Sequence, residues 1–420
     1  MSDALEVSRR VYDLLIKQAP SGIAVRTWTG ETWGPEGAAA TLVLRHPGAL
    51  RALLLPPSDL TAGEAYVFDD VDVEGDMLAM VRWVTGLGAS VAPSLQALRL
   101  LRLLLKLPRQ SRRSLASRPN LRGRRHSLHR DRTAVSHHYD TGNGFFEAVL
   151  GPSMVYSCAA FLDPGEPLEV AQRRKLDLIC RKLQLRGDQH LLDIGCGWGS
   201  LAVHAAREYG VRVMGITLSE RQAEWATDHA KRVGVDDLVE FRVQDYREVV
   251  GKYDAISSIG MFEHVGAGQL DHYFGEVQAL LRPDGVFLNH GITVRRATPM
   301  LRRKTFVYTH VFPDGELLPI DGVVRSAEQA GFELRDAESL RTSYGQTLRR
   351  WVANLESEAA DAKAATTEQT YRKWRAYMAG SALAFESGEL SVFQLVLRPS
   401  GRPWTYGRSH LLAADDVERP

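Results

Sequence analysis

The most constraining feature of this chain is a run of three glycines at every second position, within the segment LLDIGCGWG at residues 191–199. The short apolar segment from His190 to Ile194 predicts a strand, and residues 200–209 predict a helix. Because glycine has no Cβ, this turn can adopt unusual backbone angles and let a ligand lie against bare backbone. The spacing lacks the third glycine of the dinucleotide fingerprint. The segment therefore predicts a strand-to-helix turn that binds a ligand other than a dinucleotide.

Strand and helix patterns alternate along the chain from about residue 172 onward. This alternation predicts an α/β fold with a largely parallel, doubly wound, Rossmann-like sheet that has helices on both faces. Ligands bind beyond the carboxyl ends of the strands in such sheets. The expected strands are 190–194, 211–216, 239–243, 254–259 and 285–290, and the expected helices are 200–209, 219–233 and 269–281.

The length of 420 residues exceeds the usual size of one hydrophobic core, so we expect more than one domain. Short alternating segments punctuated by Pro and Gly predict a smaller α+β domain over residues 1–108. A basic linker is expected over residues 109–132 and the catalytic domain over residues 133–420.

The net charge of +1 conceals a strongly basic segment. Between Arg99 and Arg132 there are twelve Lys or Arg residues and one acid, Asp131. Residues 94–107 predict a leucine-rich helix with cations on one side. This pattern indicates contact with an anionic surface, either lipid headgroups or nucleic acid.

Cysteine content and hydropathy indicate the compartment. The chain has three cysteines without metal-ligand spacing, so we expect a reducing cytoplasm and no metal site. No run of 18 or more apolar residues occurs, and the first ten residues do not resemble a secretory signal. We therefore expect a cytoplasmic protein associated peripherally with the inner face of the plasma membrane.

Polar residues at the ends of the first three expected strands predict a nucleoside site. Asp193 stands just ahead of the glycines, where methyltransferases place an acid near the aminoacyl end of S-adenosylmethionine. Thr217 and Gln222 follow the second strand, and Asp245 with Tyr246 follows the third. An aspartate there can accept a hydrogen bond from an exocyclic amine or can cap a short helix.

Acid and imidazole groups follow the next two strands. Glu263 and His264 come directly after the strand 254–259, and His290 ends the strand after it. Cys158 could be a nucleophile, but no Cys–His–Asn hydrolase signature accompanies it.

The ordered motifs together resemble the cyclopropane-fatty-acid synthase family, over roughly residues 130–400. Members of this family use S-adenosylmethionine to modify cis double bonds in phospholipid acyl chains, and mycolic acid enzymes share the fold. The motifs are HHYDTGN (137–143), YSC (156–158), LLDIGCGWGS, TLSERQ, VQDYR, GMFEHVG, NHGI and FPDGELLP.

The resemblance implies a set of site residues. A bicarbonate ion in the active site would act as the proton acceptor. Its ligands would be Glu263, His290 and Tyr344 through side chains, and Cys158 and Ile292 through backbone. One position departs from the family pattern: Gly291 stands where relatives often carry a bulkier residue. The cofactor contacts would be Tyr156, Ser157, Gly195, Gly197, Thr217, Leu218, Gln222, Asp245 and Tyr246.

The expected reaction is methyl transfer to the double bond of an unsaturated phospholipid acyl chain, followed by deprotonation to a cyclopropane. The same transfer followed by a hydride shift would give a 10-methylene chain, and this alternative stays open. An RNA methyltransferase is disfavoured, because the basic segment 99–132 contains no aromatic residue to stack on bases. A carrier without catalysis would need loss of the acid and His positions, which are intact. We therefore expect a membrane partner and no nucleic acid, and leave homodimer formation open.

Overall fold

The computed structural model describes residues 2–16, 22–90, 95–109, 123, 125, 127, 128, 130–133, 142–296 and 305–402. The chain forms two compact units, and neither is one continuous segment. Unit 1 consists of Met1–Arg118, Leu301–Pro313 and Leu355–Leu383, and unit 2 consists of Pro119–Met300, Asp314–Asn354 and Ala384–Pro420. Among the described helices, none is long and apolar enough to cross a membrane.

Unit 1 is an α+β unit, as the sequence predicts. Its sheet has the strand order β2-β1-β3-β4, in which β1 and β3 are parallel and the other neighbours are antiparallel. The strands are β1 (Ile23–Arg26), β2 (Thr32–Trp33), β3 (Ala40–Leu44) and β4 (Val71–Gly75). The helices are α1 (Ser2–Val11), α2 (Ala49–Leu54), α3 (Asp59–Val67), α4 (Met77–Ser90), α5 (Leu95–Lys106), α12 (Phe306–His310), α15 (Ala359–Ala365) and the first part of α16 (Glu368–Ser387), with a π-helix at Tyr12–Ile16.

Two buried arginines attach α16 to the sheet of unit 1. Arg372 donates a hydrogen bond to the backbone oxygen of Val71, at 3.3 Å. Arg375 donates to the backbone oxygens of Val73 and Gly75, at 3.2 and 3.1 Å. These guanidinium groups satisfy carbonyls along β4, which explains why a segment late in the chain belongs to the unit formed mainly by its beginning.

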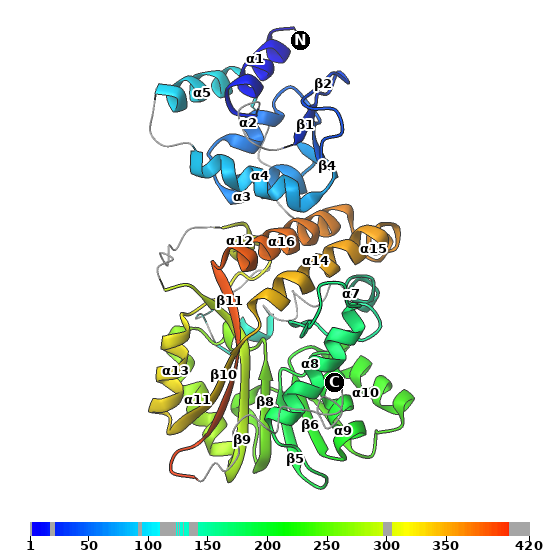
Figure 1. Cartoon of the computed structure of the whole chain (residues 1–420), viewed down its shortest axis with the longest axis vertical. Coiled ribbons are helices and arrows are strands. Elements are labelled where there is room, and N and C mark those ends of the chain that lie inside the picture. The colour runs from blue at the N-terminus through cyan, green and yellow to red at the C-terminus, as the bar shows by residue number, and fades with distance from the viewer. Residues whose placement is uncertain are drawn as a thin grey trace, which may run out of the picture. The chain divides into compact units, whose positions relative to one another are not determined.

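Unit 2 contains a seven-stranded sheet with the order β10-β11-β9-β8-β5-β6-β7 (Figure 1). Strands β5 to β9 are mutually parallel, and β10 and β11 pair in antiparallel fashion at one side of the sheet. The fold class predicted from the sequence is therefore confirmed. The strands are β5 (His190–Ile194), β6 (Arg212–Thr217), β7 (Val239–Val243), β8 (Tyr253–Ile259), β9 (Leu281–Val294), β10 (Phe332–Ser339) and β11 (Leu390–Pro399).

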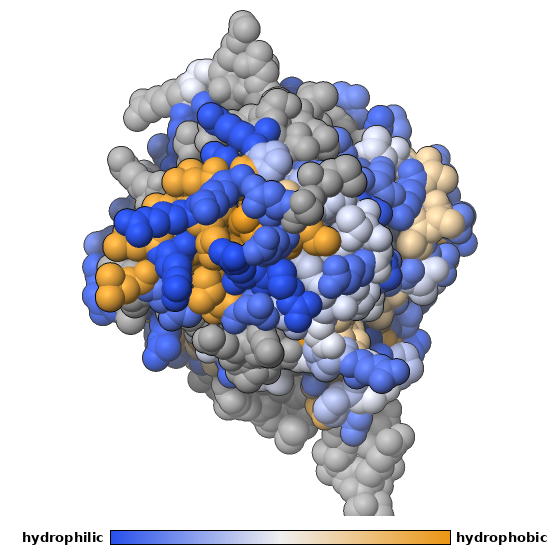
Figure 2. Space-filling view, turned by 90° about the horizontal axis from the view of Figure 1, so that it is seen from above, coloured by the Kyte–Doolittle hydropathy of each residue, from blue (hydrophilic) through white to orange (hydrophobic). Residues whose placement is uncertain are grey.

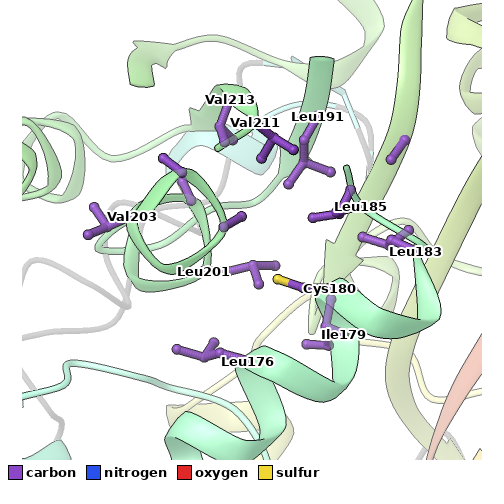
Figure 3. Packing of buried hydrophobic residues seen from close by; sticks show 14 of the residues in the cluster. Leu176, Ile179, Cys180, Leu183, Leu185, Leu191, Leu201, Val203, Val211 and Val213 are labelled. Carbon is purple, nitrogen blue, oxygen red and sulfur yellow. The ribbon is translucent and has the colours of Figure 1, made fainter. Parts of the chain in front are cut away.

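Helices cover both faces of this sheet, because successive strand residues point to opposite faces. Leu191 packs with α8 and α9 residues in one buried cluster, which Figure 3 shows around Cys180. Leu192, the next residue of β5, packs with α11 and α13 in a second cluster. The helices of unit 2 are α7 (Asn143–Leu150), α8 (Leu168–Lys182), α9 (Ser200–Tyr209), α10 (Glu220–Val233), α11 (Leu270–Leu280), α13 (Ile320–Gln329) and most of α14 (Arg341–Ser357).

The element bounds agree with the sequence prediction in the first half of the sheet and differ in the second. Strand β5 and helix α9 have the predicted bounds. Strand β9 extends to Leu281–Val294 because it pairs with β8 on one side and with β11 on the other. The two antiparallel strands β10 and β11 were not predicted, and they bring late residues beside His290.

Candidate active site

One pocket of unit 2 lies at the carboxyl ends of the parallel strands, where the sequence places the nucleoside site. Its walls come from the loops after β5, β6, β7 and β8 and from the loop before α8. All ten predicted cofactor residues line it: Tyr156, Ser157, Asp193, Gly195, Gly197, Thr217, Leu218, Gln222, Asp245 and Tyr246. The five predicted catalytic residues are not among its lining residues.

The glycine-rich loop after β5 has the left-handed backbone that its composition predicts. Gly195, Gly197 and Gly199 have φ angles of +76°, +55° and +78°. A Cβ at Gly199 would lie 2.6 Å from the Phe241 ring, so packing as well as backbone angle requires glycine there. A Cβ at Gly197 would meet no protein atom within 4 Å. Glycine at 197 therefore keeps open a space that the described chain itself does not fill.

Two buried charged groups lie at the floor of the pocket. Asp193 accepts a hydrogen bond from Ser257 at 2.7 Å, and burial raises its pKa to about 6. Lys175 of α8 donates to the Ser157 hydroxyl at 2.7 Å, and burial lowers its pKa to about 8. Gln172, one helical turn earlier, donates to the backbone oxygen of Ser157 at 2.9 Å. Helix α8 thus fixes both the side chain and the backbone of Ser157.

A short hydrogen-bonded chain orients the loop after β6. The Thr217 hydroxyl donates to Oε1 of Gln222 at 2.7 Å and accepts from the Ser219 backbone N–H at 3.2 Å. Ser219 caps α10 by accepting from the Gln222 backbone N–H at 3.3 Å. The predicted residues Thr217 and Gln222 are therefore one preorganised unit.

Asp245 is held by a cationic neighbour. Its carboxylate accepts two hydrogen bonds from the Arg247 guanidinium, both at 2.7 Å, and caps a short 3₁₀ helix through the Arg247 backbone N–H at 3.0 Å. Arg247 also donates to Asp131 at 3.1 Å. The capping alternative considered for Asp245 is thus present, while the residue still lines the pocket.

Glu263 and His290 belong to a second group of buried residues, which do not line the pocket. Glu263 Oε1 accepts from the Ile292 backbone N–H at 2.7 Å. Its other oxygen, Oε2, is buried and has no hydrogen-bond partner among the described residues. Burial raises the pKa of Glu263 to about 7 and holds the pKa of His290 well below its usual range.

Cys158 and Tyr344 both donate a hydrogen bond to the backbone oxygen of Leu340, which directly precedes α14. The Cys158 thiol donates to the backbone oxygens of Ala159 and Leu340, at 3.1 and 3.5 Å, and burial raises its pKa. A protonated, buried thiol is a poor nucleophile, which agrees with the expectation that thiol chemistry is absent. The Tyr344 ring packs on Phe385 with centroids 4.5 Å apart.

Two features connect this second group to the pocket. Lys175 acts electrostatically both on Asp193 of the pocket and on Cys158 and His290 of the second group. A row of aromatic rings runs from Tyr344 to Trp351 and on to Tyr156, with centroid separations of 6.1 and 5.3 Å.

Several pocket residues were not predicted from the sequence. Lys175 lies on an ordinary amphipathic helix, where a lysine is normally solvated. Its only signal is Gln172 three residues earlier, on the same helical face. Asp131 is the one acid of the basic segment, but nothing in the sequence indicates that it pairs with Arg247. Of the motif HHYDTGN, residues 137–141 lie outside the described residues, and Asn143 accepts from the Trp198 indole at 3.0 Å.

Solved structures with this fold include cyclopropane synthases. The cyclopropane synthase MmaA2 from Mycobacterium tuberculosis superposes with a TM-score of 0.60 and is 33% identical, covering 63% of this chain and 97% of its own. The mycolic acid cyclopropane synthase CmaA1, complexed with SAH and CTAB, gives the same values. The chain is a methyltransferase that uses S-adenosylmethionine.

The family model for mycolic acid cyclopropane synthetases matches residues 126–395. The chain therefore belongs to this family, which confirms the resemblance of its motifs. It is 36% identical to a probable fatty acid methyltransferase of Pseudomonas putida, over 91% of this chain and 95% of that protein. The cyclopropane-fatty-acyl-phospholipid synthase of Escherichia coli is also 36% identical, over 62% of this chain and 66% of its own length.

The open space at Gly197 predicts a loss of cofactor binding when it is filled. Gly197→Val should weaken the binding of S-adenosylmethionine by at least about 100-fold, close to 3 kcal/mol, in isothermal calorimetry. Gly234→Val is the matched control, because Gly234 also has a positive φ (+75°) and an open Cβ position but lies outside the pocket. Equal affinity of wild type and Gly197→Val would contradict the placement of the cofactor.

The burial of Glu263 predicts a stability that depends on pH. Its pKa of about 7 in the folded protein exceeds the ordinary value of 4.5, so the folded state binds the proton more tightly. The resulting stability is present below about pH 4.5 and is lost as the pH rises through 7, by roughly 3 kcal/mol. Denaturant unfolding should therefore show wild type losing stability relative to Glu263→Gln between pH 5 and 8. The control is Glu224→Gln, which replaces an exposed carboxylate, and its free energy of unfolding should change with pH as that of wild type does.

Proposed function

We propose that this protein transfers the methyl group of S-adenosylmethionine to the cis double bond of an unsaturated acyl chain in a membrane phospholipid, and then removes a proton to close a cyclopropane ring. The observation that carries the second step is the buried Oε2 of Glu263, which has no partner among the described residues. A buried carboxylate oxygen without a hydrogen bond is costly unless a ligand or water satisfies it.

The pocket residues would hold the methyl donor in line with the alkene. Gly197 leaves room for its aminoacyl end, and Gly195, Ser157 and Asp193 line the same pocket. An isolated alkene is a weak nucleophile, so fixed orientation supplies several kcal/mol of the barrier. The alkene's electron pair forms the new C–C bond while the S–CH₃ bond breaks and its electrons stay on sulfur.

Methyl transfer leaves a carbocation, which this unit can stabilise and protect from water. Tyr156 and Trp198 line the pocket, and Phe146 packs against both with centroid separations of 5.8 and 4.8 Å. Aromatic faces stabilise a desolvated cation by up to about 2 kcal/mol each. Excluding water prevents the cation from becoming an alcohol.

The second group fits a small oxyanion such as bicarbonate. The unpartnered Oε2 of Glu263 would accept a hydrogen bond from the acidic O–H of the bicarbonate ion. The proposed ligand set is completed by His290, Tyr344 and the backbone of Cys158 and Ile292. When bound, this ion supplies a mild base for the proton that leaves the former methyl group. Glu263, with a pKa of about 7, is suited to take or return that proton near neutral pH.

A 10-methylene product is the second candidate, and the packing of Gly291 beside the proposed base is the observation that bears on it. A Cβ at Gly291 would lie 1.8 Å from the Phe262 ring, so the ring occupies the space of a larger residue at 291. Phe262 directly precedes Glu263, so this packing affects the position of the base. The extensive match to the probable fatty acid methyltransferase of Pseudomonas putida is consistent with either product.

We also propose that α5 of unit 1 contacts the membrane from the cytoplasmic side. Leu95, Leu98, Leu101 and Leu105 are exposed, by 86%, 54%, 38% and 53%. Figure 2, seen from above, shows apolar surface crossed by hydrophilic side chains. The exposed cations of α5 are Arg99, Arg102 and Lys106. A face of this composition suits an interface between acyl chains and anionic headgroups.

Two described cations of the basic linker bind the Asp314 segment of unit 2. Arg125 donates to the backbone oxygen of Asp314 at 3.2 Å, and Arg130 makes two hydrogen bonds to the Asp314 carboxylate at 2.7 and 2.8 Å. These two cations are therefore engaged within unit 2. Residues 110–122 and 124 of the linker lie outside the described residues.

The reaction is tested with purified protein, S-adenosylmethionine and vesicles of oleoyl phospholipid. We expect the oleoyl chain to gain one CH₂ by mass spectrometry, and ozonolysis to find no alkene in the product. Glu263→Gln and His290→Ala should each reduce turnover by at least about 10²-fold, as expected for loss of general-base function.

Three outcomes are decisive in that assay. A product that ozonolysis cleaves at a methylene group would establish the second candidate, because the two products have the same mass. Unmodified vesicles would contradict the proposed substrate. Near-normal turnover in both variants would show that the base lies elsewhere.

The membrane proposal predicts a salt-dependent loss of vesicle binding. Neutralising Arg99, Arg102 and Lys106 to Gln should weaken sedimentation with anionic vesicles by roughly 1 kcal/mol per cation, and less as salt rises. The control with the same charge change replaces the exposed Arg212, Arg221 and Arg232 of unit 2. Equal sedimentation of both triple variants at low salt would exclude α5 as the docking element.

A further inference from the structure

Three buried polar side chains form a chain that ends at His290. Lys182 is the last residue of α8, Gln394 lies on β11, and His290 lies on β9. His290 and Gln394 are directly paired in the antiparallel ladder between β9 and β11, so their side chains lie on the same face of the sheet. The exposed fractions of Lys182, Gln394 and His290 are 0%, 0% and 2%.

The direction of each hydrogen bond in this chain follows from the donor at its far end. The ammonium group of Lys182 can only donate, and it donates to Oε1 of Gln394 at 2.7 Å. The amide of Gln394 is therefore oriented with its NH₂ group on the other side. Nε2 of that amide lies 3.2 Å from Nδ1 of His290. Since the NH₂ group only donates, Nδ1 must accept and cannot carry a proton.

Lys182 is itself anchored by carboxylates of β10. Its ammonium group pairs with Glu338 and lies 3.8 Å from Asp336. A fully buried ammonium group needs such partners, and they fix its position as a donor. Three adjacent strands and one helix thus determine the orientation of one amide.

We propose that Gln394, oriented by Lys182, is a positioning residue that holds His290 as the neutral imidazole with its single proton on Nε2. In this tautomer the Nε2–H group of His290 can donate a hydrogen bond to an anion bound beside Glu263. Nδ1 cannot take up a proton, because its lone pair accepts the hydrogen bond from Gln394. This inference rests on the proposed function for its catalytic meaning, although the tautomer is a property of the protein alone. It assigns the proton-accepting role to Glu263 and the bound ion, and the orienting role to His290.

The charged groups around His290 favour the same state. Burial lowers the pKa of His290, and the ammonium groups of Lys175 and Lys182 lower it further. Both lysines come from α8, while β11 contributes the uncharged Gln394. The neutral ring is therefore expected throughout the neutral pH range.

The test is ¹⁵N NMR of the full-length protein labelled at histidine, with the His290→Ala spectrum identifying the two ring nitrogens. At pH 7 we expect Nδ1 of His290 to have the shift of an unprotonated ring nitrogen and Nε2 that of a protonated one. Gln394→Glu should shift Nδ1 to a protonated value, because a carboxylate at that position can only accept. Ser391→Ala, which removes a side-chain contact between β10 and β11, should leave the wild-type pattern unchanged.

Lys182→Met is the second variant, and it removes the donor that orients the amide. We expect a mixture of tautomers, seen as intermediate shifts at both nitrogens. A wild-type spectrum with the proton on Nδ1 would overturn the inference, even if both variants failed to fold. An unchanged pattern in folded Gln394→Glu would overturn it as well.

Kinetics connect the tautomer to the reaction. Turnover of Gln394→Glu should fall by at least about 10²-fold, since a wrong tautomer in a catalytic site is that costly or more. The KM for S-adenosylmethionine should stay within about twofold, because Gln394 does not line the pocket. If the spectra behave as expected but wild type modifies no lipid, the proposed function fails and the tautomer assignment stands. If lipid is modified and wild-type Nδ1 carries the proton, only the present inference fails.

Discussion

The two halves of the candidate site depend on the burial of two lysine ammonium groups carried by one helix. Lys175 and Lys182 lie seven residues apart on α8, which places them on the same helical face. Lys175 holds Ser157 at the pocket for the methyl donor, and Lys182 holds Gln394 beside His290. Both are almost fully buried, so their interactions are strengthened by the low dielectric and are costly to break. Helix α8 is therefore a rigid support common to both groups.

The sheet determines where polar residues of the site can lie. Its central strands are buried on both faces, so polar residues collect in the loops at their carboxyl ends. Further buried polar groups lie where the antiparallel strands β10 and β11 extend the sheet, next to β9. Gln394 and Glu338 lie on these two strands, and they give the sheet the hydrogen-bonding partners that a purely parallel arrangement would have to take from loops.

The pKa changes in the site have one common cause, which is desolvation. Burial raises the pKa of Asp193 to about 6 and that of Glu263 to about 7, and it lowers that of Lys175 to about 8. These three values lie far closer together than the ordinary pKa values of free carboxyl and ammonium groups.

The sequence by itself determined the parallel half of the fold and ten of the residues that line the pocket proposed for the methyl donor. Glycine spacing and strand–helix alternation are local patterns, so the positions of Gly195, Gly197 and strand β5 follow from the residues alone. The partners of these residues do not, because they come from distant parts of the chain. Lys182 reads as an ordinary helix-terminal cation, and Gln394 as one polar residue in an apolar strand. Only the tertiary structure brings them to His290. The pairing of β9 with β11 joins His290 to Gln394, which lie 104 positions apart in the sequence, and no local pattern encodes its register. Burial, which sets the charge of Glu263 and the tautomer proposed for His290, is likewise a property of the packed unit and not of the sequence pattern.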